Sequence, residues 1–160
     1  MRRFHGSRLR RGRFSETGRM YLVTATSENR NPVFANRAAA TAVIEEMAAR
    51  ARERRCENYC FVVMPDHVHW LLQLSEDENL SNVVARTKGR SALWINRARN
   101  CAGRLWQAGF HDHAVRREED LENLANYTIL NPVRAGLVTC PEDYPYWWSR
   151  WHPGGFPFRG

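Results

Sequence analysis

The chain has 160 residues, 43% of them hydrophobic, a length and apolar content typical of one folded domain. No apolar run reaches the ~20 residues of a membrane-spanning helix, and the basic N-terminus lacks the apolar segment of a secretion signal. We therefore expect a soluble cytoplasmic protein with no membrane partner, and these features exclude an integral membrane protein.

The charge is strongly positive and unevenly distributed. The formal net charge is +7, and two blocks of sequence, residues 2–13 and 79–111, are basic and contain no acidic residue. The first block holds six arginines: Arg2, Arg3, Arg8, Arg10, Arg11 and Arg13. Guanidinium groups bind phosphate oxygens and stack on bases, so these arginines predict contacts with nucleic acid. The base composition of the genome explains part of the arginine excess but not two acid-free blocks.

The periodicity of apolar residues predicts an alternation of strands and helices. Segments rich in β-branched and aromatic residues predict strands at 19–26, 59–64, 67–74 and, irregularly, 105–115. Helical spacing of apolar residues predicts helices at 36–55, 80–99 and 118–130. The order β-α-β-β-α-β-α predicts an α+β fold, a ferredoxin-like or RRM-like antiparallel sheet with helices packed on one face. We divide the chain into a basic arm (1–18), one domain (19–140) and an aromatic tail (141–160).

The predicted hairpin at 59–74 places two histidines on one strand face. Strand alternation puts His67 and His69 on the side opposite four apolar residues, Val68, Trp70, Leu72 and Leu74. Two imidazoles at this spacing can bind one cation, although alternating polar residues on an exposed strand also produce the pattern. A second His-x-His pair, His111 and His113, lacks the apolar alternation, so the metal is assigned to the first pair.

Tyr127 and Asn131 are four residues apart, which places them on one face of the last predicted helix. Pro132 ends that helix, so the side-chain oxygen of Asn131 lies at a helix terminus and is available to a ligand. The residues alone favour a structural interpretation, in which Tyr127 is a half-buried aromatic and Asn131 caps a helix.

Three longer motifs occur in the order V-V-M-P-D-H-V-H-W-L-L, L-W-Q-A-G-F-H-D-H-A-V-R-R-E-E-D-L and Y-T-I-L-N-P-V-R-A-G-L-V. Together they resemble the REP-associated tyrosine transposases of the single-tyrosine HUH superfamily, from about Arg19 to Trp148. The chain departs from the pattern of that family at three positions. Asp66 stands where Asn is more common, Arg117 where an acid is common, and Trp148 where a small residue is common.

The resemblance implies that His67, His69 and Asn131 bind a divalent metal ion, Mg²⁺ or Mn²⁺, and that Tyr127 is the nucleophile. It also implies that His113 and Arg116 support the site or contact DNA.

Three further residues are assigned from their positions alone. Gln73 shares the strand face of the two histidines and is either a group that supports the metal ligands or a surface polar residue. Lys88 and Arg90, on the second predicted helix, either face the DNA backbone or lie on a solvated helix face.

The predicted function is cleavage and rejoining of DNA. A tyrosinate attacks a phosphodiester and forms a 5′-phosphotyrosine, while the metal polarises the phosphoryl oxygen. We expect a bacterial enzyme, monomeric or homodimeric, that acts on single-stranded DNA folded into palindromic, REP-like hairpins. One alternative is a domesticated protein that binds DNA hairpins with little or no nuclease activity. Another is an RNA-binding domain, which would usually carry aromatic residues where His67 and His69 stand.

Overall fold

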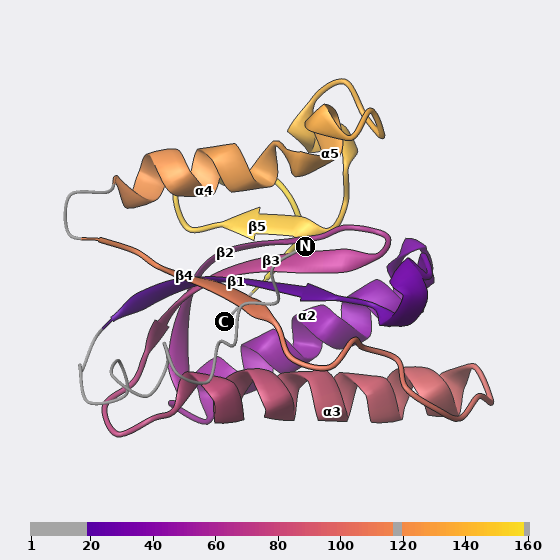
Figure 1. The fold of residues 1–160 in the computed structure, drawn as a ribbon. Coiled ribbons are helices and arrows are strands. Elements are labelled where there is room, and N and C mark those ends of the chain that lie inside the picture. Colours follow the sequence, from indigo (N-terminus) through magenta and orange to yellow (C-terminus); the bar gives the residue numbers. More distant parts are fainter. Residues whose placement is uncertain (1–18, 117–119, 159–160) are drawn as a thin grey trace.

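A five-stranded antiparallel sheet forms the centre of the molecule, in the order β4-β1-β3-β2-β5 (Figure 1). The computed structural model describes residues 19–116 and 120–158. The strands are β1 (Met20–Thr26), β2 (Cys56–Val63), β3 (His67–Leu74), β4 (His111–Ala114) and β5 (Trp147–Ser149). The predicted α+β class is confirmed, and the hairpin of β2 and β3 is formed as expected.

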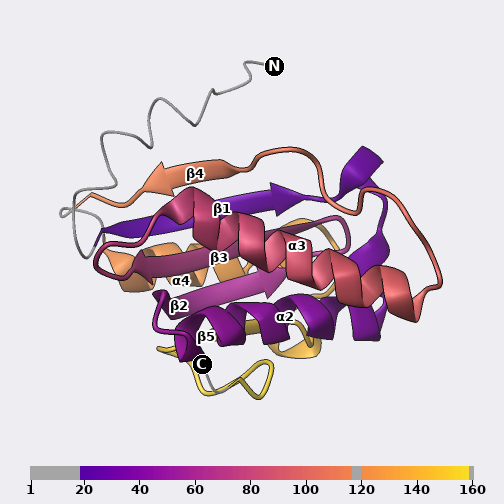
Figure 2. The ribbon, with the colours of Figure 1, turned by 90° about the horizontal axis from the view of Figure 1, so that it is seen from below.

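The helices lie on both faces of the sheet, not on one. The long helices α2 (Arg37–Arg52) and α3 (Leu80–Ala98) pack on one face as predicted, whereas α4 (Leu121–Ile129) and the short α5 (Asn131–Arg134) lie on the other (Figures 1 and 2). Short 3-10 turns occupy Glu28–Arg30, Val33–Ala35 and Pro141–Asp143. The expectation that all helices pack on one face of the sheet is therefore wrong, because α4 packs on the face opposite α2 and α3.

Each helix of eight or more residues begins at a capping side chain. The side chains of Asn36, Asn79 and Asp120 accept hydrogen bonds from backbone N–H groups in the first turns of α2, α3 and α4, respectively. These bonds satisfy donors that have no partner within the helix, which explains where each helix starts. In α4 the Asp120 carboxylate also favours the positive end of the helix dipole.

The face under α2 and α3 carries the larger hydrophobic core. The four apolar residues of the hairpin predicted to share one face, Val68, Trp70, Leu72 and Leu74, are buried there, together with Tyr21, Val23 and Phe61. The polar Asn58 is buried among them, because its amide donates to the carbonyl of Met47 (3.1 Å) and accepts from Nε1 of Trp70 (2.7 Å). β2 begins at Cys56, earlier than the apolar pattern indicates, because Cys56 pairs with Leu74 at the end of β3.

A second, smaller core fills the opposite face. It contains Cys60, Val62 and Leu71 from the sheet, packed with Ala125 and Ile129 of α4. The central part of β2 is consequently covered on both sides, which accounts for its unbroken apolar run at 60–64. This core attaches α4 to the same sheet face that bears His67 and His69.

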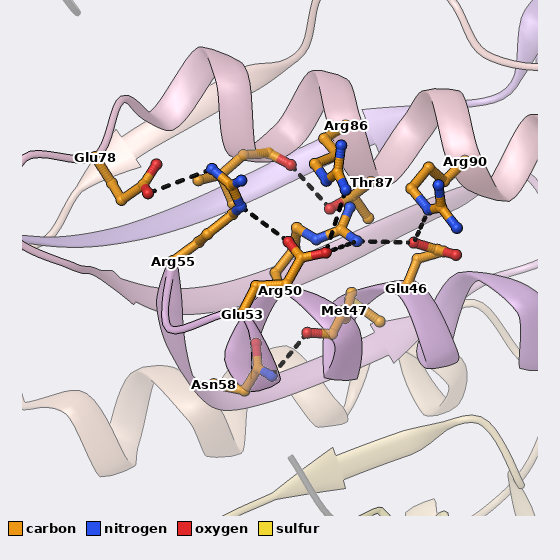
Figure 3. A network of polar contacts seen from close by, with 11 residues as sticks. Glu46, Met47, Arg50, Glu53, Arg55, Asn58, Glu78, Arg86, Thr87 and Arg90 are labelled. Atoms are coloured by element: carbon orange, nitrogen blue, oxygen red, sulfur yellow. Dashed lines mark hydrogen bonds and ion pairs between the residues drawn. The ribbon is translucent and has the colours of Figure 1, made fainter.

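A network of charged side chains connects α2 with α3 (Figure 3). The fully buried Arg50 bonds to Glu46 and Glu53, each at 3.1 Å. Arg90 and Arg86 of α3 pair with the same two carboxylates, each at 3.4 Å. Both contacts of the buried guanidinium are made by Nη2, while its buried Nε and Nη1 have no hydrogen-bond partner among the described residues. The two carboxylates therefore offset the buried charge without satisfying every donor.

The C-terminal tail belongs to the sheet. Residues Trp147–Ser149 form β5, which pairs with β2, and Trp147 is buried against the second core. Of the predicted strand at 105–115, only His111–Ala114 forms a strand, while Trp106 makes an isolated bridge to Ser27. Among the described residues, no helix has the length and apolar character needed to span a membrane.

Candidate active site

The two histidines begin β3, directly after the turn at Pro65-Asp66. Both are partly buried, and their rings meet edge to face with centroids 4.8 Å apart. The antiparallel register places Thr24 of β1 opposite His69 and Thr26 opposite His67. The strand pattern therefore brings two imidazoles together, as the sequence predicts, on the sheet face that carries α4.

Each histidine has a neighbour at Nδ1. Nδ1 of His67 lies 2.6 Å from Oδ1 of Asp66, and Nδ1 of His69 lies 3.0 Å from the hydroxyl of Thr24. A carboxylate only accepts hydrogen bonds, so in the neutral form of His67 the proton is on Nδ1 and Nε2 keeps a free lone pair. This is the arrangement of a histidine that binds a metal through Nε2, with a second group fixing the ring.

The surroundings of the two histidines favour the neutral imidazole form of His69. Burial, followed by electrostatic interactions with His67 and Arg134, lowers the pKa of His69 to about 4. Burial alone would raise the pKa of Asp66, but hydrogen bonds from His67 and Arg30 outweigh it and the pKa is lowered. Asp66 is therefore ionised and His69 is neutral at pH 7, and a metal ligand must be neutral imidazole.

Tyr127 lies in the last turn of α4 and is 63% exposed, whereas Ala125 and Ile129 of the same helix are buried in the second core. The guanidinium carbon of Arg134 lies 3.9 Å from the centroid of the Tyr127 ring. Nη1 of Arg134 also donates to the main-chain carbonyl of Tyr127 at 2.7 Å. The phenol is thus open to solvent and held against a cation.

Asn131 is the first residue of α5, where Pro132 starts a new turn. Its side-chain nitrogen donates to the carbonyl of Thr128 at 2.7 Å, which fixes the amide and leaves its oxygen for another partner. Arg134, three residues after Asn131, interacts with both the tyrosine and the histidines of the site. It stacks on Tyr127, and its charge lowers the pKa of His69.

These residues fit a divalent metal ion. Within residues 19–116 and 120–158, no three His, Cys, Asp or Glu side chains form a metal-binding group, so a third protein ligand must be of another type. The amide oxygen of Asn131 is a group of another type that can bind a hard divalent ion. Two imidazole nitrogens and one oxygen leave coordination positions for phosphate and water, a donor set that accepts Mn²⁺ or Mg²⁺.

The second His-x-His pair lies on the same sheet face as the first. His111 pairs with Thr24 and His113 with Leu22 of β1, so both side chains point to the side of His69. Both are exposed on the edge strand β4, with β1 between them and β3. His113 and the exposed Arg116 therefore border the face that carries the site.

Three predicted residues lie away from the histidines. Gln73, near the far end of β3, accepts a hydrogen bond from the hydroxyl of Tyr59 at 2.9 Å. Lys88 and Arg90 belong to α3, on the opposite sheet face. Nζ of Lys88 donates to the carbonyls of Gln107 (2.7 Å) and Gly109 (2.6 Å), and burial lowers its pKa to about 8. The structure does not bring these three residues into the site.

The six arginines predicted to contact DNA, at positions 2–13, lie outside the described residues, as does Arg117. Sequence reasoning assigned no role to Thr24 or Arg134. The signal for Thr24 is the register of β1 on β3, which a single sequence does not contain. Arg134 follows Asn131 by three residues, a spacing that places it on the same side of the chain once α5 forms.

Comparison with known proteins decides the family. Residues 16–129 match the family model described as "Transposase IS200 like". The chain belongs to this family. This IS200-like transposase is 30% identical, over 81% of its length and 78% of the relative's, to a Haemophilus influenzae protein provisionally named a REP-associated tyrosine transposase. It is also 30% identical to the REP-associated tyrosine transposase of Escherichia coli, over 59% of this chain and 55% of that protein.

A solved structure agrees with this assignment. The transposase is similar to a REP-associated tyrosine transposase whose structure was determined bound to a REP hairpin. The TM-score is 0.65 and the identity 25%, over 83% of this chain and 78% of the other. The family is one of single-tyrosine transposases, so the chain is an enzyme of that class.

Proposed function

We propose that this transposase cleaves and rejoins single-stranded DNA beside palindromic, REP-like hairpins, with Tyr127 as the nucleophile and Mg²⁺ or Mn²⁺ bound by His67, His69 and Asn131. The observation that carries the proposal is the arrangement of His67 and His69. Both present Nε2 while Asp66 and Thr24 engage Nδ1, on the sheet face to which α4 brings the exposed Tyr127.

In the proposed reaction Tyr127 supplies the nucleophile, and protons are exchanged with solvent. The phenol of Tyr127 loses its proton to solvent, its oxygen forms a bond to phosphorus, and the bond from phosphorus to the 3′ oxygen breaks. The 3′ oxygen takes up a proton, which leaves a 3′-hydroxyl and a 5′-phosphotyrosine, and attack by a 3′-hydroxyl reverses the reaction. A bound divalent ion would supply polarisation of a non-bridging phosphate oxygen. The exposure of Tyr127 allows a DNA strand to reach it.

The substrate follows from charge, geometry and the relative that binds a REP hairpin. The net charge of +7 favours a polyanion. A tyrosine fixed on a helix reaches a phosphate only if the strand bends into the site, which a single strand does at lower cost than a regular duplex.

The test is incubation of the protein with Mn²⁺ and a labelled hairpin taken from the DNA that flanks its own gene. We expect cleavage of the hairpin and none of the fully paired duplex. Tyr127→Phe should abolish cleavage and leave binding within a few-fold, whereas the control Tyr59→Phe, on a residue bonded to Gln73, should cleave normally. Hairpin binding by the wild-type protein without cleavage would instead support the domesticated DNA-binding alternative.

A further inference from the structure

Arg134 is held against the proposed nucleophile by two contacts. Cζ of its guanidinium lies 3.9 Å from the centroid of the Tyr127 ring, and Nη1 donates a hydrogen bond to the carbonyl of the same residue at 2.7 Å. The first contact fixes the ring and the second fixes the backbone from which the ring extends. One arginine therefore limits the motion of the phenol at both ends.

The charge of Arg134 is not neutralised by a carboxylate among the residues the structure describes. Some other arginines that the structure describes are paired with carboxylates, such as Arg30 with Asp66 and Arg150 with Glu57, each at 3.1 Å. Arg134 is exposed to solvent. A guanidinium with no carboxylate partner, held against the ring of the proposed nucleophile, is placed to receive an anion.

We propose that Arg134 is a further active-site residue, which fixes the Tyr127 phenol and binds a non-bridging oxygen of the scissile phosphate. This inference rests on the proposed function. Arginine has five N–H donors, and the Tyr127 carbonyl uses one of them, so donors remain for phosphate. As the Tyr127 oxygen attacks, negative charge grows on the non-bridging oxygens, and a fixed cation stabilises that state more than the resting phosphodiester.

The chain contains a matched control. Arg150 lies with Cζ 3.5 Å from the centroid of the Tyr59 ring, and its Nη2 bonds to the carbonyl of Asn58 at 3.0 Å. This stack has the same two contacts as that of Arg134, but the carboxylate of Glu57 neutralises it. Arg150→Gln therefore removes an equivalent structural contact without removing a free charge beside Tyr127.

The test is a double-mutant cycle that combines the substitution Arg134→Gln with removal of the charge of the scissile phosphate. Single-turnover cleavage is measured with saturating hairpin that carries either the natural phosphodiester or an uncharged methylphosphonate at the scissile position. We expect Arg134→Gln to slow cleavage of the natural phosphate by about tenfold to a hundredfold. Cleavage of the methylphosphonate should slow much less, because only the loss of phenol positioning affects that substrate. Arg134→Lys, which keeps the charge, should retain the dependence on phosphate charge, and Arg150→Gln should match wild type.

The inference is overturned if Arg134→Gln cleaves like wild type, or if its loss is the same on both substrates. A binding measurement separates this failure from that of the proposed function. In the Tyr127→Phe background, which cuts nothing, Arg134→Gln should weaken binding of the natural hairpin by roughly threefold more than binding of the methylphosphonate hairpin. If this difference in binding is found but the wild-type protein cleaves no hairpin, the proposed nuclease activity is refuted and the contact between Arg134 and the phosphate is supported. If Arg134→Gln weakens binding of the two hairpins equally, the contact is refuted.

Discussion

Thr24→Val tests whether the neighbours of the histidines matter for metal binding. Valine has nearly the shape of threonine but cannot bond to Nδ1 of His69, which lies 3.0 Å from the hydroxyl. Loss of a group that orients a metal-binding histidine weakens metal affinity by about 10- to 100-fold, or about 1.4–2.8 kcal/mol. His69 is partly buried, so the lost bond is not fully replaced by water. We expect the Kd for Mn²⁺ to rise by that factor.

The assay is calorimetric titration with Mn²⁺, repeated as the Mn²⁺ dependence of hairpin cleavage. The control is Thr26→Val on the same strand and face, because Thr26 lies opposite His67, whose Nδ1 is already engaged by Asp66. The control should bind Mn²⁺ like wild type. Equal Mn²⁺ affinity of Thr24→Val and wild type would refute the assignment of Nε2 of His69 as a metal ligand.

Three further predictions address the metal, the arm and the lysine. His69→Ala should remove Mn²⁺-dependent cleavage and His111→Ala should not, and the reverse result in metal titrations would move the site to β4. Deletion of residues 1–13 should flatten the slope of log K against log salt by roughly 3–4 units, at about 0.7 per phosphate contact, and parallel slopes in fluorescence anisotropy would exclude the arm from binding. Lys88, whose pKa is lowered to about 8, holds fewer protons in the folded than in the unfolded state between pH 8 and its ordinary pKa. Stability should therefore rise with pH across that window, a rise that urea titrations should show for wild type and not for Lys88→Met.

The strands and long helices could be predicted because their patterns are local. Alternation along 67–74 and helical spacing along 80–99 depend only on neighbouring residues, and both elements form within one residue of the expected bounds. The side of the sheet on which α4 packs is not a local property. Its one signal was the unbroken apolar run at 60–64, typical of a strand that is covered on both faces.

The same distinction between local and non-local features applies to the site. The spacing of His67 and His69, and of Tyr127 and Asn131, follows from strand and helix geometry. Their partners do not, because Thr24 reaches His69 only through the pairing of strands distant in sequence. Burial of the tail is equally non-local, since Trp147 is covered only after β5 joins the edge of β2.

The central claim is that Tyr127 becomes covalently bound to DNA. The most direct measurement is mass spectrometry of peptides from wild-type protein incubated with the hairpin and Mn²⁺, with the adduct mapped to a single residue. The account predicts a nucleotide attached through its 5′ phosphate to the peptide that contains Tyr127, and no adduct with Tyr127→Phe. An adduct on a different residue, or cleavage of the hairpin with no covalent adduct at any time point, would contradict it.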